Sequence, residues 1–243
     1  GAGVQSSTLL LMAVHGEIAR PDRAIFADTG WEPRAVYEHL DWIAEQAAAA
    51  GIPVERVSAG NIRADMLRGS PPSSRQSRRR FVTMPLYSRN EQGHPSMLRR
   101  QCTTEYKVRP IYRRLRELGA TAQSPVELWL GITLDEVTRM KVAPVGYVIN
   151  RWPLIERRMT RHDCLRWLDR HGYDRPPKSS CIGCPYHDDR WWRELRDTSP
   201  DEWQDAVEFD RAIRHRAGIE QPVYLHRAML PLDEVDLSTP QER

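Results

Sequence analysis

The stretch RAIFADTGWEPRAVYEHLDWIAEQAAAAGIPVERVSAG, residues 23–60, decides the fold of this chain. Residues 23–30 are a short apolar run that ends in polar groups from Asp28 onward, which is typical of a buried strand with ligand-binding residues at its carboxyl end. Residues 33–50 begin with proline and have helical periodicity, and residues 53–60 indicate a further strand. A strand, a helix and a strand in this order favour a parallel sheet covered by helices.

Before this stretch, two glycines and two serines run into an apolar helix, in GAGVQSSTLLLMAV, residues 1–14. Gly1 and Gly3 would let the backbone turn tightly, so that Ser6, Ser7 and the first helix amides face a phosphate. The alternative is an ordinary helix start in which Ser6 or Ser7 is the N-cap. The same alternation of elements predicts a first strand before Gly1.

The rest of the chain extends this α/β pattern. Residues 69–96 read as a long loop without periodicity, residues 103–119 as a helix, and residues 126–133 as an apolar strand that ends in glycine. We therefore predict a doubly wound parallel sheet in residues 1–149, which form the nucleotide-binding domain. Residues 150–243 are predicted to be a mainly helical, cysteine-containing region packed on it.

Composition favours a soluble globular protein, because 40% of the 243 residues are hydrophobic and 28% are charged. No stretch has the length of a membrane span and no signal peptide is visible, so we expect a cytoplasmic protein without a membrane partner. The net charge is only +3, but arginines are concentrated in residues 63–116. This density favours contact with nucleotide or nucleic-acid phosphates, and a solvated arginine-rich face is the alternative. The substrate-binding candidates are Arg78, Arg79, Arg80, Arg99, Arg100 and Arg109.

The strongest local signal is SSCIGCPYH, residues 179–187, in which two thiolates three residues apart on an Ile-Gly turn can ligate one metal centre. A thioredoxin-like redox pair is the alternative. The candidate metal ligands are the four cysteines, Cys102, Cys164, Cys181 and Cys184. For Cys164 the alternative is a buried helix cysteine, and His162 and His187 are substitute ligands.

Five segments in this order resemble one family. GAGVQSS resembles the pyrophosphate loop (PP-loop) of the N-type ATP pyrophosphatases, within the adenine nucleotide alpha hydrolase superfamily. ADTGWEP, residues 27–33, and RQCTTEYKVRPI, residues 100–111, resemble the Asp-Thr-Gly and Cys-x-x-x-x-Lys-x-x-Pro segments of phosphoadenosine-phosphosulfate (PAPS) reductases. GITLDEVTRM, residues 131–140, resembles the Gly-Ile-x-x-Asp-Glu-x-x-Arg segment of phage, prophage and DNA-modification members. SSCIGCPYH resembles the second cysteine pair of the iron–sulfur members.

Three departures from the family pattern are informative. Gln5 stands where the common loop has an acidic residue. The iron–sulfur reductases have two adjacent cysteines where this chain has only Cys102, and Cys164 is the candidate replacement. Those reductases also attack sulfate with a cysteine near the carboxyl terminus, whereas no cysteine follows Cys184 here. A reductase mechanism is therefore disfavoured, and the resemblance points to the iron–sulfur ATP pyrophosphatase of DNA phosphorothioation systems and to relatives among tRNA-thiolating enzymes.

The resemblance implies an enzyme that converts ATP to AMP and pyrophosphate and adenylates a nucleic-acid or nucleotide substrate for sulfur transfer. It implies magnesium, a 4Fe-4S cluster with zinc as the alternative, a DNA or RNA acceptor, and a sulfur donor such as a cysteine desulfurase. The expected nucleotide-binding residues are Gly1, Gly3, Gln5, Ser6, Ser7, Asp28, Thr29 and Gly131, with Gly131 letting the backbone approach the adenine or ribose. The expected catalytic residues are Lys107, Asp135, Glu136 and Arg139, for which exposed helix charges are the alternative. A sulfonucleotide reductase and a non-catalytic nucleotide-binding module with structural zinc remain the alternative functions.

Overall fold

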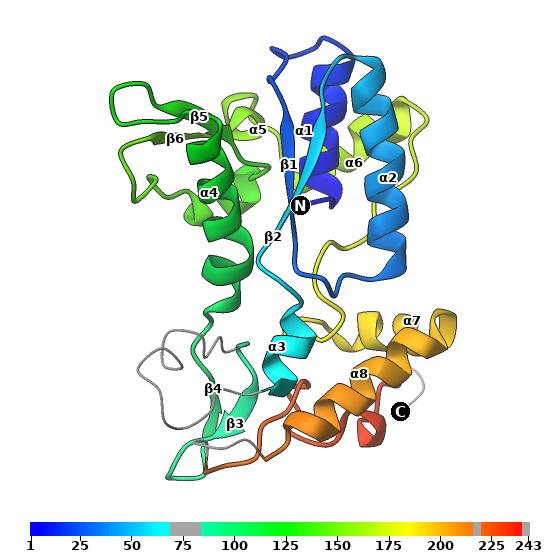
Figure 1. Cartoon of the computed structure of the whole chain (residues 1–243). Helices are drawn as coiled ribbons and strands as arrows, with labels where there is room; N and C mark the ends of the chain where they lie inside the picture. The colour runs from blue at the N-terminus through cyan, green and yellow to red at the C-terminus, as the bar shows by residue number, and fades with distance from the viewer. Residues whose placement is uncertain (69–83, 216–219, 240–243) are drawn as a thin grey trace. The chain divides into compact units, whose positions relative to one another are not determined.

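The computed structural model describes residues 1–68, 84–215 and 220–239, and it contains two compact units (Figure 1). Unit 1 comprises Gly1–Asp28, Arg34–Val57 and Arg109–Ser179, and unit 2 comprises Thr29–Pro33, Ser58–Val108 and Ser180–Arg243. The sequence-based boundary after residue 149 thus falls inside unit 1. Across the residues described, no helix combines the length and the apolar character needed to cross a membrane.

Unit 1 is a mixed α/β unit with two small parallel sheets. Its elements are α1 (Val4–Val14), β1 (Ala24–Asp28), α2 (Arg34–Ala49), β2 (Val54–Ser58), α4 (Arg109–Glu117), β5 (Val126–Trp129), the 3-10 helix η3 (Leu134–Arg139), β6 (Val148–Arg151), α5 (Pro153–Glu156) and α6 (Arg161–Arg170). The amide of Ala24 donates to the carbonyl of Pro53 at 2.9 Å, so β1 and β2 begin side by side and run in the same direction. In the second sheet β5 and β6 are parallel, with Val126 beside Val148. The expected strands in residues 23–30, 53–60 and 126–133 are confirmed, whereas β6 was not predicted.

Helix α1 occupies the centre of the helical layer of unit 1, in contact with α2 and α6 (Figure 1). Leu11, Met12 and Val36 are almost completely buried there, which explains why α1 is apolar on several sides. The helix begins at Val4 with Gly3 as its N-cap. Ser6 and Ser7 lie inside the first turn, so the alternative in which one of them is the N-cap is wrong.

Unit 2 is built around tryptophans and the helices near the carboxyl end of the chain. Its elements are α3 (Ile62–Arg68), β3 (Tyr87–Arg89), β4 (Pro95–Met97), the π-helix η2 (Thr103–Val108), α7 (Asp189–Thr198), α8 (Pro200–Ile213) and the 3-10 helix η4 (Leu232–Glu234). Of the predicted loop 69–96, residues 69–83 lie outside the described residues, and the remainder contains most of the antiparallel hairpin β3–β4. The loop prediction is therefore wrong for this part, because three-residue strands are too short to show periodicity.

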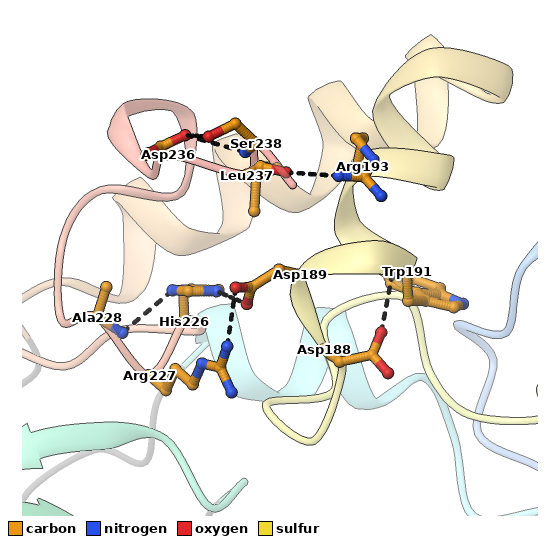
Figure 2. Close-up of polar contacts among 10 residues, drawn as sticks. All are labelled: Asp188, Asp189, Trp191, Arg193, His226, Arg227, Ala228, Asp236, Leu237 and Ser238. Atoms are coloured by element: carbon orange, nitrogen blue, oxygen red, sulfur yellow. Dashed lines mark hydrogen bonds and ion pairs between the residues drawn. The ribbon is translucent and has the colours of Figure 1, made fainter. Parts of the chain in front are cut away.

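Polar contacts fasten the carboxyl-terminal segment to α7 (Figure 2). Nδ1 of His226 accepts from the amide of Ala228 at 3.1 Å, so Nε2 carries the proton and donates to Asp189 at 3.0 Å. Arg227 donates to the other oxygen of the same carboxylate at 2.8 Å. Because Asp189 is the first residue of α7 and lies five residues after Cys184, these contacts hold the start of the helix that follows the cysteine turn.

Candidate nucleotide loop and cysteine site

The loop at the start of unit 1 is held by Ser179. The amide of Ala2 donates to the Ser179 hydroxyl at 3.2 Å, and a Cβ added at Gly3 would lie 3.6 Å from the Ser179 side chain. Gly3 then leads into α1, and its carbonyl accepts from the amide of Ser7 at 2.9 Å. The first-turn amides before Ser7 have no acceptor within the helix by α-helical geometry, so they give this end of α1 a positive partial charge.

Gly131 follows β5 and lies against the first turn of α1. A Cβ added there would be 2.9 Å from the Ser6 nitrogen and 3.0 Å from the Ser6 Cα. These neighbours are backbone atoms and cannot move aside without shifting the helix. A close backbone approach was expected at Gly131, and in the structure Gly131 approaches the first turn of α1.

Gln5 joins this loop to the segment that carries the predicted catalytic acids. Its amide nitrogen donates to Glu136 at 3.2 Å, and its amide oxygen accepts from Arg161 at 2.8 Å. Glu136 also accepts from Arg139 at 2.6 Å. An acidic residue at position 5 would place a second carboxylate against Glu136, so the departure from the family pattern fits this site.

Asp135 belongs to the same group. Its carboxylate accepts from the backbone amide of Arg161 at 3.0 Å. The neighbouring Thr133 hydroxyl and the Arg161 amide both lower the pKa of Asp135. The structure therefore brings together Gln5, Asp135 and Glu136 around Arg161. The sequence analysis missed Arg161, since its partner Gln5 is 156 residues away.

Two further predicted residues of unit 1 interact with α2. The Ser7 hydroxyl lies 2.8 Å from Nε2 of His39 and is buried, and the carboxylate of Asp28 accepts from the Tyr37 hydroxyl at 2.9 Å. Burial lowers the pKa of His39, which favours the neutral ring. His39 was not predicted, because a single histidine in a helix has no motif around it.

In unit 2, Thr29, Glu32 and Lys107 surround Cys181. The Thr29 hydroxyl is 3.2 Å from the Cys181 sulfur, and the Lys107 ammonium is 3.4 Å from a carboxylate oxygen of Glu32. Burial alone would lower the pKa of Lys107, but the charges of Glu32 and of the thiols raise it above its usual value. Lys107 is therefore a fixed cation beside the cysteines. Glu32, whose side chain is completely buried, was missed by the sequence analysis.

Of the two thiols in the cysteine turn, Cys181 is buried and Cys184 is half-buried, and both favour the neutral form when no metal is bound. Burial raises the pKa of Cys181 to about 12 and also raises that of Cys184. A charge on Cys102 would also raise the pKa of Cys184. Both Cys102 and Cys184 pack against the same apolar core as Cys181.

The glycine of this turn is required by a tryptophan. A Cβ added at Gly183 would lie 2.2 Å from the Trp31 ring, whose own indole nitrogen donates to Asp205 at 2.6 Å. The ring is buried and cannot swing away. Nε2 of His187 donates to the carbonyl of Cys181 at 2.9 Å, so this histidine shapes the turn.

Cys164 lies elsewhere, on α6 in the core of unit 1. It is completely buried among apolar residues that include Leu11 and Leu154, and burial raises the pKa of its thiol to about 11. This environment is that of the buried helix cysteine considered as the alternative. His162 is on the same helix and exposed.

The residue types of unit 2 fit a thiolate-ligated metal or cluster, because Cys181 lies beside the pair of Glu32 and Lys107, and Cys102 and Cys184 pack against the same core. Three thiolates buried together need positive charge, which a metal and Lys107 would supply. Among the residues that the structure describes, no group of three histidine, cysteine or acidic side chains is arranged closely enough to hold a metal ion.

The predicted substrate arginines are spread over both units. Arg99 and Arg100 are exposed in unit 2, where the Arg100 guanidinium lies 5.2 Å from the ring centre of Tyr186, itself half exposed. Arg109 is exposed at the start of α4 in unit 1. Arg78, Arg79 and Arg80 lie outside the described residues.

Comparison with known proteins adds no identification. No protein-family model matches the chain, and a search of curated proteins finds no match to it.

Proposed function

We propose that this chain is an ATP-dependent adenylating enzyme that cleaves ATP to AMP and pyrophosphate and prepares a nucleic-acid or nucleotide substrate for sulfur transfer. The observation that carries the proposal is the hydrogen-bonded group in which Gln5 links the glycine loop to Glu136 and Arg161. Loop amides and guanidinium groups gathered at a helix start are the groups that a polyphosphate requires.

In the proposed reaction a substrate oxygen attacks the α-phosphorus of ATP. The bond from this phosphorus to the bridging oxygen breaks, and pyrophosphate leaves with that oxygen. The first-turn amides of α1, Arg139 and Arg161 would stabilise the negative charge that develops. A magnesium ion bound to the phosphates and Asp28 would supply further charge neutralisation. A sulfur nucleophile from a donor protein of the cysteine desulfurase type then displaces AMP from the adenylated substrate.

Cys102, Cys181 and Cys184 would hold a 4Fe-4S cluster, or a zinc ion in its place, with Lys107 offsetting thiolate charge. The exposed pair of Arg100 and Tyr186 offers a cation and a ring to a nucleic-acid strand. All four cysteines are free thiols, which fits a reducing compartment such as the cytoplasm. We also propose that the two parallel pairs of unit 1 belong to one doubly wound sheet.

The test uses protein purified without oxygen, with its iron, sulfide and zinc quantified, incubated with ATP or with PAPS in the presence of DNA or RNA. We expect AMP and pyrophosphate from ATP, rising with one nucleic acid. Glu136→Gln should abolish this activity, whereas Glu117→Gln should not. Glu117 is the matched control, because it also pairs with an arginine three residues away but lies at the end of α4.

Two other results would overturn the proposal. Sulfite released from PAPS while ATP stays intact would mean a sulfonucleotide reductase. A zinc-containing protein that binds ATP without turnover would mean a non-catalytic module.

A further inference from the structure

Unit 1 contains a cavity of about 1040 Å³ between its two parallel sheets. Strands β1 and β5 form its two sides. Residues of α1 and α2, among them Leu9, Leu10 and Leu40, cover one face, and Ile111 and Leu115 of α4 cover the other. Figure 1 shows β1 between α1 and α4. The cavity is thus covered on two faces, as the interior strand of a three-layer α/β domain is covered.

Each strand beside the cavity has one edge without a neighbouring strand. Among the residues that the structure describes, β1 pairs only with β2, and β5 pairs only with β6. Strand edges present rows of amide and carbonyl groups that pair readily with another strand. Two such edges therefore lie beside one cavity, and a single inserted strand would pair with both.

The ends of the cavity fix the direction of the inserted strand. Gly1, Ser6 and Gly131 line the end at which β1 and β5 finish, whereas Arg23 and Pro125 line the end at which these strands begin. A strand parallel to both would therefore finish beside Gly1. Its last residue could continue directly into the glycine loop.

The volume fits one strand. Strand spacing of about 4.8 Å, sheet separation of about 10 Å and a rise of about 3.4 Å give roughly 160 Å³ per residue in a packed sheet. A cavity of about 1040 Å³ then holds about six residues, close to the five of β1.

Connection handedness leads to the same arrangement. Parallel strands joined through a helix almost always make right-handed crossovers. The inserted strand would connect through α1 to β1, and β1 connects through α2 to β2, so both crossovers move across the sheet in the same direction. Two right-handed crossovers in the same direction place their helices on the same face of the sheet. Helices α1 and α2 do lie together, and α4 covers the opposite face.

We propose that this cavity is the seat of a β-strand of about six apolar residues joined to the amino end of Gly1. The strand pairs in parallel with β1 on one side and β5 on the other. It unites the two small sheets into one five-stranded sheet in the order β2, β1, inserted strand, β5, β6, and it anchors the glycine loop. This arrangement does not depend on whether the loop binds ATP.

The test joins three six-residue extensions to Gly1 of the full chain. The first is Val-Val-Ile-Val-Ala-Phe, the second is Gly-Ser-Gly-Ser-Gly-Ser, and the third is Val-Pro-Ile-Pro-Ala-Pro, which is apolar but lacks half of the amide donors. Amide hydrogen exchange is measured in β1 and β5. We expect the first extension alone to slow exchange in both strands by about tenfold or more.

A second variant guards against an extension that merely sticks to the surface. Leu128 of β5 lines the cavity, so Leu128→Lys should remove the protection given by the first extension while leaving the unextended chain folded. Equal exchange with all three extensions would overturn the proposal. The proposal would also be overturned if the unextended chain sedimented as a dimer and its β1 and β5 amides were already protected from exchange. A second copy of the chain would then pair with the edges of these strands.

Discussion

At the scale of single residues, Gly131 offers a sharp test of how the loop is held. Gly131→Ala would push a methyl group to within 2.9 Å of the Ser6 backbone, so we expect a loss of about 1–3 kcal/mol in the free energy of unfolding. Gly146→Ala is the matched control, since its Cβ would meet only Ala122 at an ordinary 3.8 Å. Urea denaturation of both variants measures the difference. Equal losses would mean that α1 moves freely away from Gly131.

His39 gives the molecule a predictable response to acid. Burial lowers its pKa in the folded state below the ordinary histidine value of about 6.5. Between the two pKa values the unfolded chain binds more protons, so stability is fully present above pH 6.5 and is lost as the pH falls through the folded-state pKa. His39→Gln keeps a donor for Ser7 and does not titrate. We expect the native chain to lose more stability than this variant between pH 7.5 and pH 5, measured by urea denaturation. Parallel losses would contradict the assignment.

At the scale of elements, the cysteine turn and the segment bearing Trp31 form one packed assembly. Gly183→Ala would drive a methyl group into the Trp31 ring, so we expect reduced stability, together with loss of the proposed metal or cluster. Trp31→Leu in the same chain should restore part of the stability, because a smaller side chain leaves room for the methyl group. The measurement is metal content and thermal unfolding of the single and double variants. If Gly183→Ala without Trp31→Leu left metal content and thermal unfolding unchanged, the turn would be free to move.

The elements also show where sequence reasoning succeeds. Strand β1 and helix α2 were predicted because an apolar run and a long periodic helix carry their own signal. The hairpin β3–β4 was missed, since its strands have three residues each and show no period. Strand β6 was missed as well, because it is defined by its pairing with β5. The site divides in the same way. Glycine and cysteine motifs were visible, but Glu32, His39 and Arg161 act through partners distant in sequence, which no local pattern can indicate.

At the scale of the whole molecule, each unit has its own apolar core, so a defect in one core should stay there. Asp210 tests this in unit 2. Its buried carboxylate forms an ion pair with Arg214 and accepts from the backbone amides of Leu225 at 2.8 Å and Leu232 at 3.1 Å. Asp210→Ala would leave a buried cation and two amides without this partner, and we expect a cost of about 3–5 kcal/mol. Amide hydrogen exchange should therefore accelerate in α8 and in residues 223–237 but not in α1 or α2.

The exposed Asp201 of α8 provides the control, because Asp201→Ala should change exchange in neither region. Acceleration that spreads equally to α1 would mean that the two cores unfold as one cooperative structure.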